Sequence, residues 1–200
     1  MNRALKRKDI NLFFKTLSKE WPYSAEILLV GASVALIIGG ERPTLDIDFE
    51  VSITSKNPRK LKNFAEKVRE VAAKLGIEIQ FSEDVDSWSQ ISFLDYNKHG
   101  RLYKKYGKIT VNILEPSYWS IGKVTRYWQR DIKDMELVFS RKKPDPVQLA
   151  KLWLKALRKS PASTALFGVK KQMSHFFKTS GPKIWKKVLP LDKILALFEE

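Results

Sequence analysis

A small-residue turn followed by two closely spaced carboxylates, within residues 31–48, constrains the fold more than any other feature. Gly31-Ala-Ser33 follows an apolar run, and Asp46 and Asp48 stand one residue apart shortly afterwards. If residues 44–53 form a strand, its two-residue period points both carboxylates to one face. The opposite face then carries Leu45, Ile47, Phe49 and Val51. One face therefore suits a core, and the other suits a hard cation such as Mg²⁺, which binds one or two carboxylates plus substrate phosphates.

The remaining pattern predicts an α/β chain. We expect strands at residues 25–30, 77–81, 101–106 and 108–114, and helices at 9–20, 33–38 and 57–75, the first capped by Asp9 and the last by Asn57. Residues 117–140 read as one helix or two short ones, and further helices are expected at 147–159, 162–178 and 182–200, with a break at Pro190. Strands mixed with helices, followed by helices alone, indicate an α/β domain at residues 1–143 and a basic helical domain at 144–200.

Positive charge is concentrated near the C-terminal end. The net charge is +15, and residues 141–187 contain thirteen Lys or Arg residues against a single acid, Asp145. A basic field of this size attracts nucleic acid or an anionic membrane surface. The lopsided balance favours nucleic-acid contact over an ordinary solvated surface.

Several classes of protein do not fit the sequence. Cysteine is absent, so thiolate zinc sites and disulfides are excluded, which fits a reducing cytoplasm. The longest apolar run, residues 27–40, is too short to span a bilayer, and we expect no signal peptide. His99 and His175 are isolated, and no phosphate-binding GxxxxGK[ST] loop is present. We expect the aromatic residues after residue 118 to pack in the core rather than stack on bases; they are Trp119, Tyr127, Trp128, Trp153 and Trp185.

The turn and the acids together have a chemical logic. Backbone amides at the start of a helix bind phosphate, and paired carboxylates hold the metal that bridges phosphate oxygens. This arrangement suits a nucleoside triphosphate, whereas the plainer interpretation is a strand with two exposed acids beside a glycine turn.

Gly31-Ala-Ser33, Arg42, Thr44 and Asp46-Ile-Asp48 resemble the signature of the nucleotidyltransferase (polymerase-β-like) superfamily. The similarity is to its minimal prokaryotic members, which include abortive-infection-type toxins, and it spans about residues 9–140. Residues 118–134 resemble the Lys/Arg helix that follows the last core strand in those proteins. The implied fold is a mixed sheet flanked by helices, and the implied substrate is a nucleoside triphosphate (NTP). Because the family includes toxins, the resemblance also implies a protein partner or an antitoxin as a candidate binding partner.

The resemblance implies a role for each matching residue. Asp46 and Asp48 would ligate Mg²⁺ or Mn²⁺, and Lys123 would offset triphosphate charge as a third catalytic residue, with Arg126 as a second cation. The implied nucleotide-binding residues are Gly31, Ser33, Arg42, Thr44, Lys123 and Arg126. The plainer interpretation of Lys123 and Arg126 is a solvated helix face.

One position departs from the superfamily pattern. A third carboxylate usually stands on a later core strand, and Asn112 occupies that place here. Asn cannot accept a proton as a carboxylate does. Glu115, Asp84 and Asp86 are the candidate substitutes.

Three functions therefore remain open. The first is an Mg²⁺-dependent enzyme that transfers a nucleotide to a hydroxyl of an RNA, such as a tRNA end, or of a protein. The second is a nucleotidyltransferase fold without catalysis that binds nucleic acid or regulates a partner. The third and weakest is a peripheral membrane protein that uses its basic helices.

Overall fold

The computed structural model describes residues 4–53, 58–84 and 89–199, and the chain divides into two compact units. The first unit comprises Met1–Val85 with Gly100–Leu114, and the second comprises Asp86–His99 with Glu115–Glu200. The division does not follow the predicted boundary at residue 143. It falls earlier because the helices after residue 115 share a core with the later helices.

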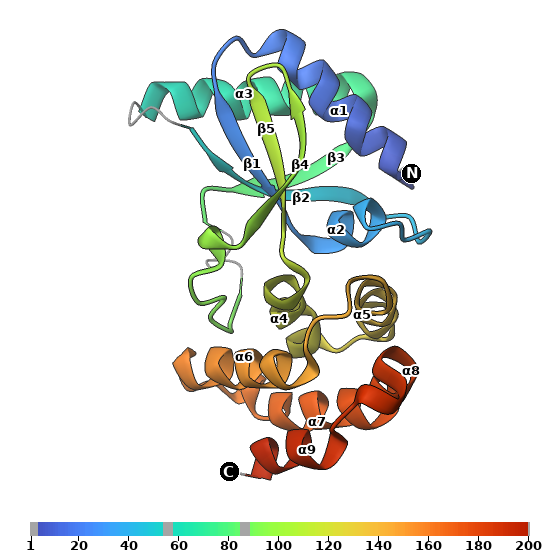
Figure 1. Ribbon diagram of the computed structural model, residues 1–200. Coiled ribbons are helices and arrows are strands. Elements are labelled where there is room, and N and C mark those ends of the chain that lie inside the picture. Colours follow the sequence, from blue (N-terminus) through green and yellow to red (C-terminus); the bar gives the residue numbers. More distant parts are fainter. Residues whose placement is uncertain (1–3, 54–57, 85–88, 200) are drawn as a thin grey trace. The chain divides into compact units, whose positions relative to one another are not determined.

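Five strands of the first unit form one mixed sheet in the order β3-β2-β1-β5-β4 (Figure 1). The strands are β1 (Ala25–Leu29), β2 (Asp46–Ser52), β3 (Glu78–Ser82), β4 (Gly100–Tyr106) and β5 (Ile109–Leu114). β1 pairs antiparallel with β2 and parallel with β5, while β2–β3 is parallel and β4–β5 antiparallel. The α/β fold class with a mixed sheet is thereby confirmed.

The side chains of β2, which lies between β3 and β1, alternate between the two faces of the sheet as the sequence predicts. Ile47, Phe49 and Val51 are buried, whereas Asp46, Asp48 and Glu50 are partly exposed on the other face. The prediction was wrong for Leu45, which is 57% exposed. The strand begins only at Asp46, so Leu45 precedes the region where alternation applies.

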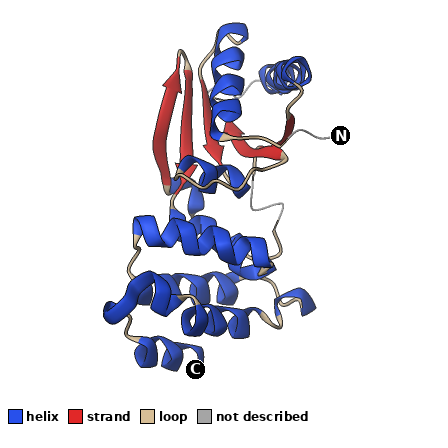
Figure 2. Cartoon of the chain, turned by 90° about the vertical axis from the view of Figure 1, so that its right-hand side faces the viewer, coloured by secondary structure: helices blue, strands red, loops and turns tan. Residues whose placement is uncertain are grey.

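Two helices cover the apolar face of the sheet, α1 (Arg7–Glu20) and α3 (Pro58–Leu75), and both lie to one side of the strands in Figure 2. The Phe49 ring lies 6.3 Å from that of Phe13 and 5.8 Å from that of Phe14, between centroids. Asp9 is not the cap residue of α1 as predicted. It lies in the first turn, and its carboxylate accepts a hydrogen bond from the Lys6 amide at 2.8 Å. Asn57, the predicted cap of α3, lies outside the described residues.

The second unit is built mainly from helices. They are α4 (Pro116–Arg126), α5 (Gln129–Lys142), α6 (Pro146–Lys159), α7 (Val169–Thr179), α8 (Gly181–Trp185) and α9 (Leu191–Glu199). Residues 117–140 thus form two helices, and Pro190 separates α8 from α9 as predicted. The helix expected at residues 162–178 begins only at Val169. Ser163 accepts a hydrogen bond from the Ala165 amide, and such local bonding competes with an α-helix.

Trp153 explains why α4 and α5 belong with the later helices. Its fully buried ring lies 6.4 Å from that of Phe139 on α5 and 5.6 Å from that of Phe176 on α7. Its indole N–H donates to the Ser120 hydroxyl of α4 at 2.9 Å. One side chain therefore joins four helices. In the described part of the chain, no helix has the length and apolar character needed to cross a membrane.

We expect Asp145→Ala to destabilise the second unit modestly. The Asp145 carboxylate accepts a hydrogen bond from the Gln148 amide at 2.8 Å, and Pro146 starts α6. Loss of such a cap costs about 1 kcal/mol of unfolding free energy. Urea denaturation measures it, with Asp145→Asn as the matched control that keeps the cap. Equal losses in both variants would contradict the capping role.

Candidate active site

Gly31 and Asp48 are in direct contact in the first unit. Gly31 begins α2 (Gly31–Ile37) with φ +57°, a conformation that glycine adopts without strain. A methyl group in its place would lie 1.9 Å from Asp48 Oδ2 and 2.7 Å from its Cγ. The Val30 amide donates to the Asp48 carbonyl at 3.0 Å, which fixes the two segments together. The glycine turn and the second acid are therefore one packed element.

Thr44 positions the first acid. Its hydroxyl donates to Asp46 Oδ1 at 3.2 Å. Its own backbone pairs with Leu5 through two hydrogen bonds of 2.7 and 3.2 Å, and its side chain is buried. Thr44 therefore orients a carboxylate from a fixed backbone.

The acidic face of β2 carries a third carboxylate that we did not single out from the sequence. Glu50 continues the two-residue period of Asp46 and Asp48 and is partly exposed. Within the described residues, no three His, Cys, Asp or Glu side chains lie close enough together to hold a metal ion. Two carboxylates still suffice for Mg²⁺ when substrate phosphates supply further ligands.

Ser33 and Arg42, the other predicted phosphate contacts of this unit, differ in exposure. Arg42 is partly exposed in a bend before Thr44. Ser33 is fully buried, and its hydroxyl has no hydrogen-bond partner among the described residues. A buried hydroxyl without a partner costs about 1–3 kcal/mol. A bound phosphate or an ordered water would satisfy it.

Asn112 lies on the same sheet face as the acids. The strand register aligns Glu50 with Leu28 and Leu28 with Asn112, so paired side chains share one face. Two strand spacings separate Asn112 from β2, about 9–10 Å. The position expected for a third carboxylate thus carries a neutral amide on the acidic face.

The candidate substitutes for that carboxylate lie elsewhere. Asp84 is exposed beyond the end of β3. Glu115 follows β5 in the second unit, where its Oε2 lies 3.5 Å from His99 Nδ1. Asp86 lies outside the described residues.

Lys123 is neither solvated nor open to a ligand within its own unit. The side chain is 4% exposed, and its Nζ lies 2.8 Å from Asp131 Oδ1 and 2.9 Å from Asp134 Oδ2. A buried ammonium between two buried carboxylates stabilises the junction of α4 and α5. Its predicted role toward a triphosphate stays a prediction, and the surroundings of Lys123 favour a structural role.

Arg126 shares one of these partners. It is 47% exposed, and its guanidinium meets Asp131 in a fork of 2.9 and 3.3 Å. Burial works against ionisation of Asp131, but the hydrogen bond from Arg126 and the charge of Lys123 outweigh it, so the pKa of Asp131 lies below its ordinary value. Arg126 therefore keeps Asp131 charged and still reaches solvent.

Trp128 corrects the prediction that the later tryptophans are core residues. Trp119, Trp153 and Trp185 are buried as predicted, but Trp128 is 53% exposed. The guanidinium of Arg130 lies 4.2 Å from its ring centroid, and that of Arg126 lies 5.8 Å away. The turn between α4 and α5 thus presents an aromatic ring flanked by two cations.

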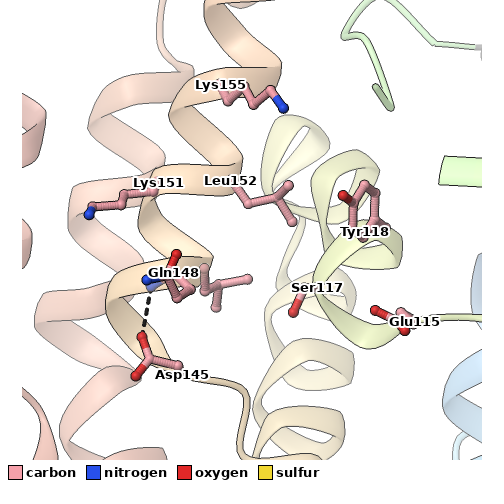
Figure 3. A pocket seen from close by; sticks show the side chains of 9 residues that line it. Glu115, Ser117, Tyr118, Asp145, Gln148, Lys151, Leu152 and Lys155 are labelled. Atoms are coloured by element: carbon pink, nitrogen blue, oxygen red, sulfur yellow. Dashed lines mark hydrogen bonds between the residues drawn. The ribbon is translucent and has the colours of Figure 1, made fainter. Parts of the chain in front are cut away.

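A hollow of about 350 Å³ lies between α4 and α6 in the second unit (Figure 3). In Figure 3, Leu152 and Lys155 extend toward the helix that carries Tyr118, whereas Lys151 extends away from it. Burial, and then the nearby carboxylates of Asp95 and Glu115, raise the pKa of Tyr118. Because two carboxylates and two ammonium groups line the hollow, it selects no single ligand charge. No local sequence pattern indicates this hollow, since its walls come from two helices.

The structure therefore joins the predicted residues in two groups. Gly31 contacts Asp48, and Thr44 contacts Asp46, in the first unit, whereas Lys123 and Arg126 share Asp131 in the second. Comparisons with protein-family models, curated proteins and solved structures find no match to this chain. What is established is a mixed α/β protein with an acidic sheet face next to a glycine turn.

Proposed function

We propose that the chain is a nucleotidyltransferase that moves a nucleotide from an NTP to a hydroxyl of an RNA or a protein. The observation that carries the proposal is the contact between Gly31 and Asp48. A turn with a positive φ packs against one of two same-face carboxylates and leaves no room for a side chain. Turns without side chains let a backbone approach phosphate closely, and the adjacent carboxylates suit a hard cation.

Each residue of this cradle has a chemical task under the proposal. Asp46 and Asp48 would hold Mg²⁺ or Mn²⁺, which when bound neutralises phosphate charge and polarises the P–O bond. Thr44 holds Asp46 in place through its hydroxyl. The missing side chain of Gly31 lets the Asp48 carboxylate lie against the start of α2, and Ser33 offers a hydroxyl that has no other partner among the described residues.

The proposed acceptor is an RNA because of the charge distribution. The excess of Lys and Arg after residue 141 would bind phosphates in a salt-dependent way without reading sequence. A protein acceptor remains part of the proposal through the resemblance alone.

Nucleotide transfer tests the proposal. We expect the full chain with Mg²⁺ or Mn²⁺ to label total RNA or a protein from one of the four α-labelled NTPs. Asp46→Asn/Asp48→Asn should abolish labelling because the metal ligands lose their charge, whereas Glu66→Gln on α3 should leave it intact. Absence of labelling with every NTP, metal and acceptor would contradict the proposal.

A second function is favoured by two observations. Asn112 occupies the strand position at which the resemblance implies a carboxylate, and Lys123 is held by Asp131 and Asp134. Both suit a fold that has lost catalysis and binds nucleic acid or a partner. Calorimetric titration with NTP separates the two functions. Mg²⁺-dependent affinity that Asp46→Asn removes supports the enzyme, and its absence supports the binding module.

A further inference from the structure

We propose that α7 and Phe167, which lies two positions before the start of α7, form the surface that holds a single-stranded RNA. This inference rests on the proposed function, because it places the acceptor. It names a site within the second unit that can be tested without any nucleotide transfer.

A hollow of about 540 Å³ marks this surface, which lies along α7 and α9. Its lining contains three lysines and one glutamate; the residues are Phe167, Lys170, Lys171, Ser174, His175, Lys178, Leu195, Phe198 and Glu199. The charged lining is thus dominated by ammonium groups, which attract phosphate. We refer to this hollow as the α7 groove.

The lysines of the α7 groove are arranged along one helix. Lys170 and Lys178 are eight positions apart, which places their backbone positions about 12 Å apart along the axis. Ser174 lies between them on the same face, since residues four apart meet on a helix surface. Successive phosphates of one extended strand can therefore contact the same helix.

Phe167 supplies an aromatic ring at the edge of the groove. It is 87% exposed, the highest value among the exposed large apolar side chains of the described residues. Its neighbours hold the backbone of Phe167 in place. Leu166 is buried, and the Phe167 amide donates to the Thr164 carbonyl at 3.2 Å in a short 3₁₀ turn. An exposed ring beside cations is the combination that binds single strands through base stacking.

The shape of the site favours RNA over a membrane surface. A bilayer is flat, and several protruding apolar side chains strengthen binding to it. At the α7 groove one ring protrudes, and the lysines border a hollow. The apolar residues Leu195 and Phe198 are inside the groove, and Phe198 is buried. A strand with phosphates on the helix and one base on Phe167 uses each of these features.

Fluorescence anisotropy with a short labelled oligouridylate, without NTP or Mg²⁺, tests the site in the full chain. We expect Phe167→Ala to weaken binding about tenfold, the loss of one stacked base. Lys170→Gln/Lys171→Gln should reduce the slope of log affinity against log salt by about 1.4, because two phosphate contacts are lost. The charge-matched control Lys104→Gln/Lys105→Gln on β4 and the aromatic control Tyr23→Ala should change neither quantity.

Other outcomes decide against the site. Unchanged RNA affinity in a folded Phe167→Ala protein overturns it, as does tighter binding of the matching DNA strand. Binding to phosphatidylserine vesicles that Phe167→Ala removes, with RNA affinity unchanged, would assign the surface to a membrane instead. RNA binding that depends on Phe167, in a wild-type chain that transfers no nucleotide with any NTP, metal or acceptor, supports this site and contradicts the proposed function.

Discussion

Gly31→Ala should destabilise the first unit by about 3 kcal/mol, which combines two separate costs. A residue other than glycine at φ +57° costs about 1–2 kcal/mol. The new methyl group would also lie 1.9 Å from Asp48 Oδ2, so the carboxylate must move, and such overpacking costs about 1–3 kcal/mol. We expect the displaced Asp48 to lose any Mg²⁺-dependent nucleotide affinity as well.

Gly76→Ala is the matched control for this prediction. Gly76 has φ +61°, but a methyl group there would meet no atom within 4 Å. It should therefore show only the backbone cost, about 1–2 kcal/mol. Urea denaturation measures both variants, and the difference between them isolates the contact with Asp48.

Asp48→Ala provides a further check on Gly31→Ala. Removing the carboxylate leaves Cβ of residue 48, which would lie 2.9 Å from the new methyl group. Gly31→Ala should therefore be less costly in this background than in the wild type, but still costly. Equal losses for Gly31→Ala and Gly76→Ala, or full additivity of Gly31→Ala and Asp48→Ala, would show that the two residues do not constrain each other.

Lys123→Met should destabilise the second unit by about 3–5 kcal/mol, because it leaves two buried carboxylates without their ammonium partner. Arg126→Met removes a half-exposed partner of Asp131, so its cost should be nearer 1 kcal/mol. The double variant Lys123→Met/Asp134→Asn should be more stable than Lys123→Met, because it leaves one buried carboxylate fewer without its ammonium partner. Chemical denaturation measures all three variants.

Lowering the pH should reduce the difference in unfolding free energy between Lys123→Met and the wild type. In the wild type the pKa of Asp131 is lowered in the folded state, so its contribution to stability is present above about pH 4 and is lost as the pH falls through the folded pKa. Without Lys123, the pKa of Asp131 should rise. The folded variant would then take up a proton at higher pH, which stabilises it relative to neutral pH. Denaturation at pH 7 and pH 5 compares the two proteins.

The same variant separates a structural role for Lys123 from the predicted nucleotide contact. A purely structural role predicts the stability loss and its pH dependence. If Lys123→Met kept wild-type stability but lost NTP affinity, the ion pairs with Asp131 and Asp134 would not be the function of this side chain.

The sequence predicted most of what depends on neighbouring residues. The alternation of β2, the break between α8 and α9, and the glycine turn at the start of α2 follow from periods and turn chemistry over a few residues. Thr44, predicted to contact a nucleotide, positions Asp46 in the structure, and this depends on its pairing with Leu5, far away in the sequence.

The missed features depend on pairings between distant residues. Lys123 has the same local pattern as a solvated lysine, and only the packing of α5 on α4 brings Asp131 and Asp134 to it. Likewise, the exposure of Trp128 and Phe167 depends on where helices end, and the start of α7 was predicted seven residues too early. Helix ends are set by local bonds such as that of Ser163, which weak periodic signals do not reveal.

The order of the chain through the two units has a consequence for how they can be separated. The segment before β4 belongs to the helical unit, where the Ser92 amide donates to the Ser160 hydroxyl at 2.8 Å, and the chain then returns to complete the sheet with β4 and β5. No single cut of the chain yields both units whole. A fragment ending at residue 143 would carry α4 and α5 without Trp153, and the helices after it would lack Ser120. The basic helices are therefore not an exchangeable appendage, and any gain or loss of them by recombination would have to include the segment that precedes β4.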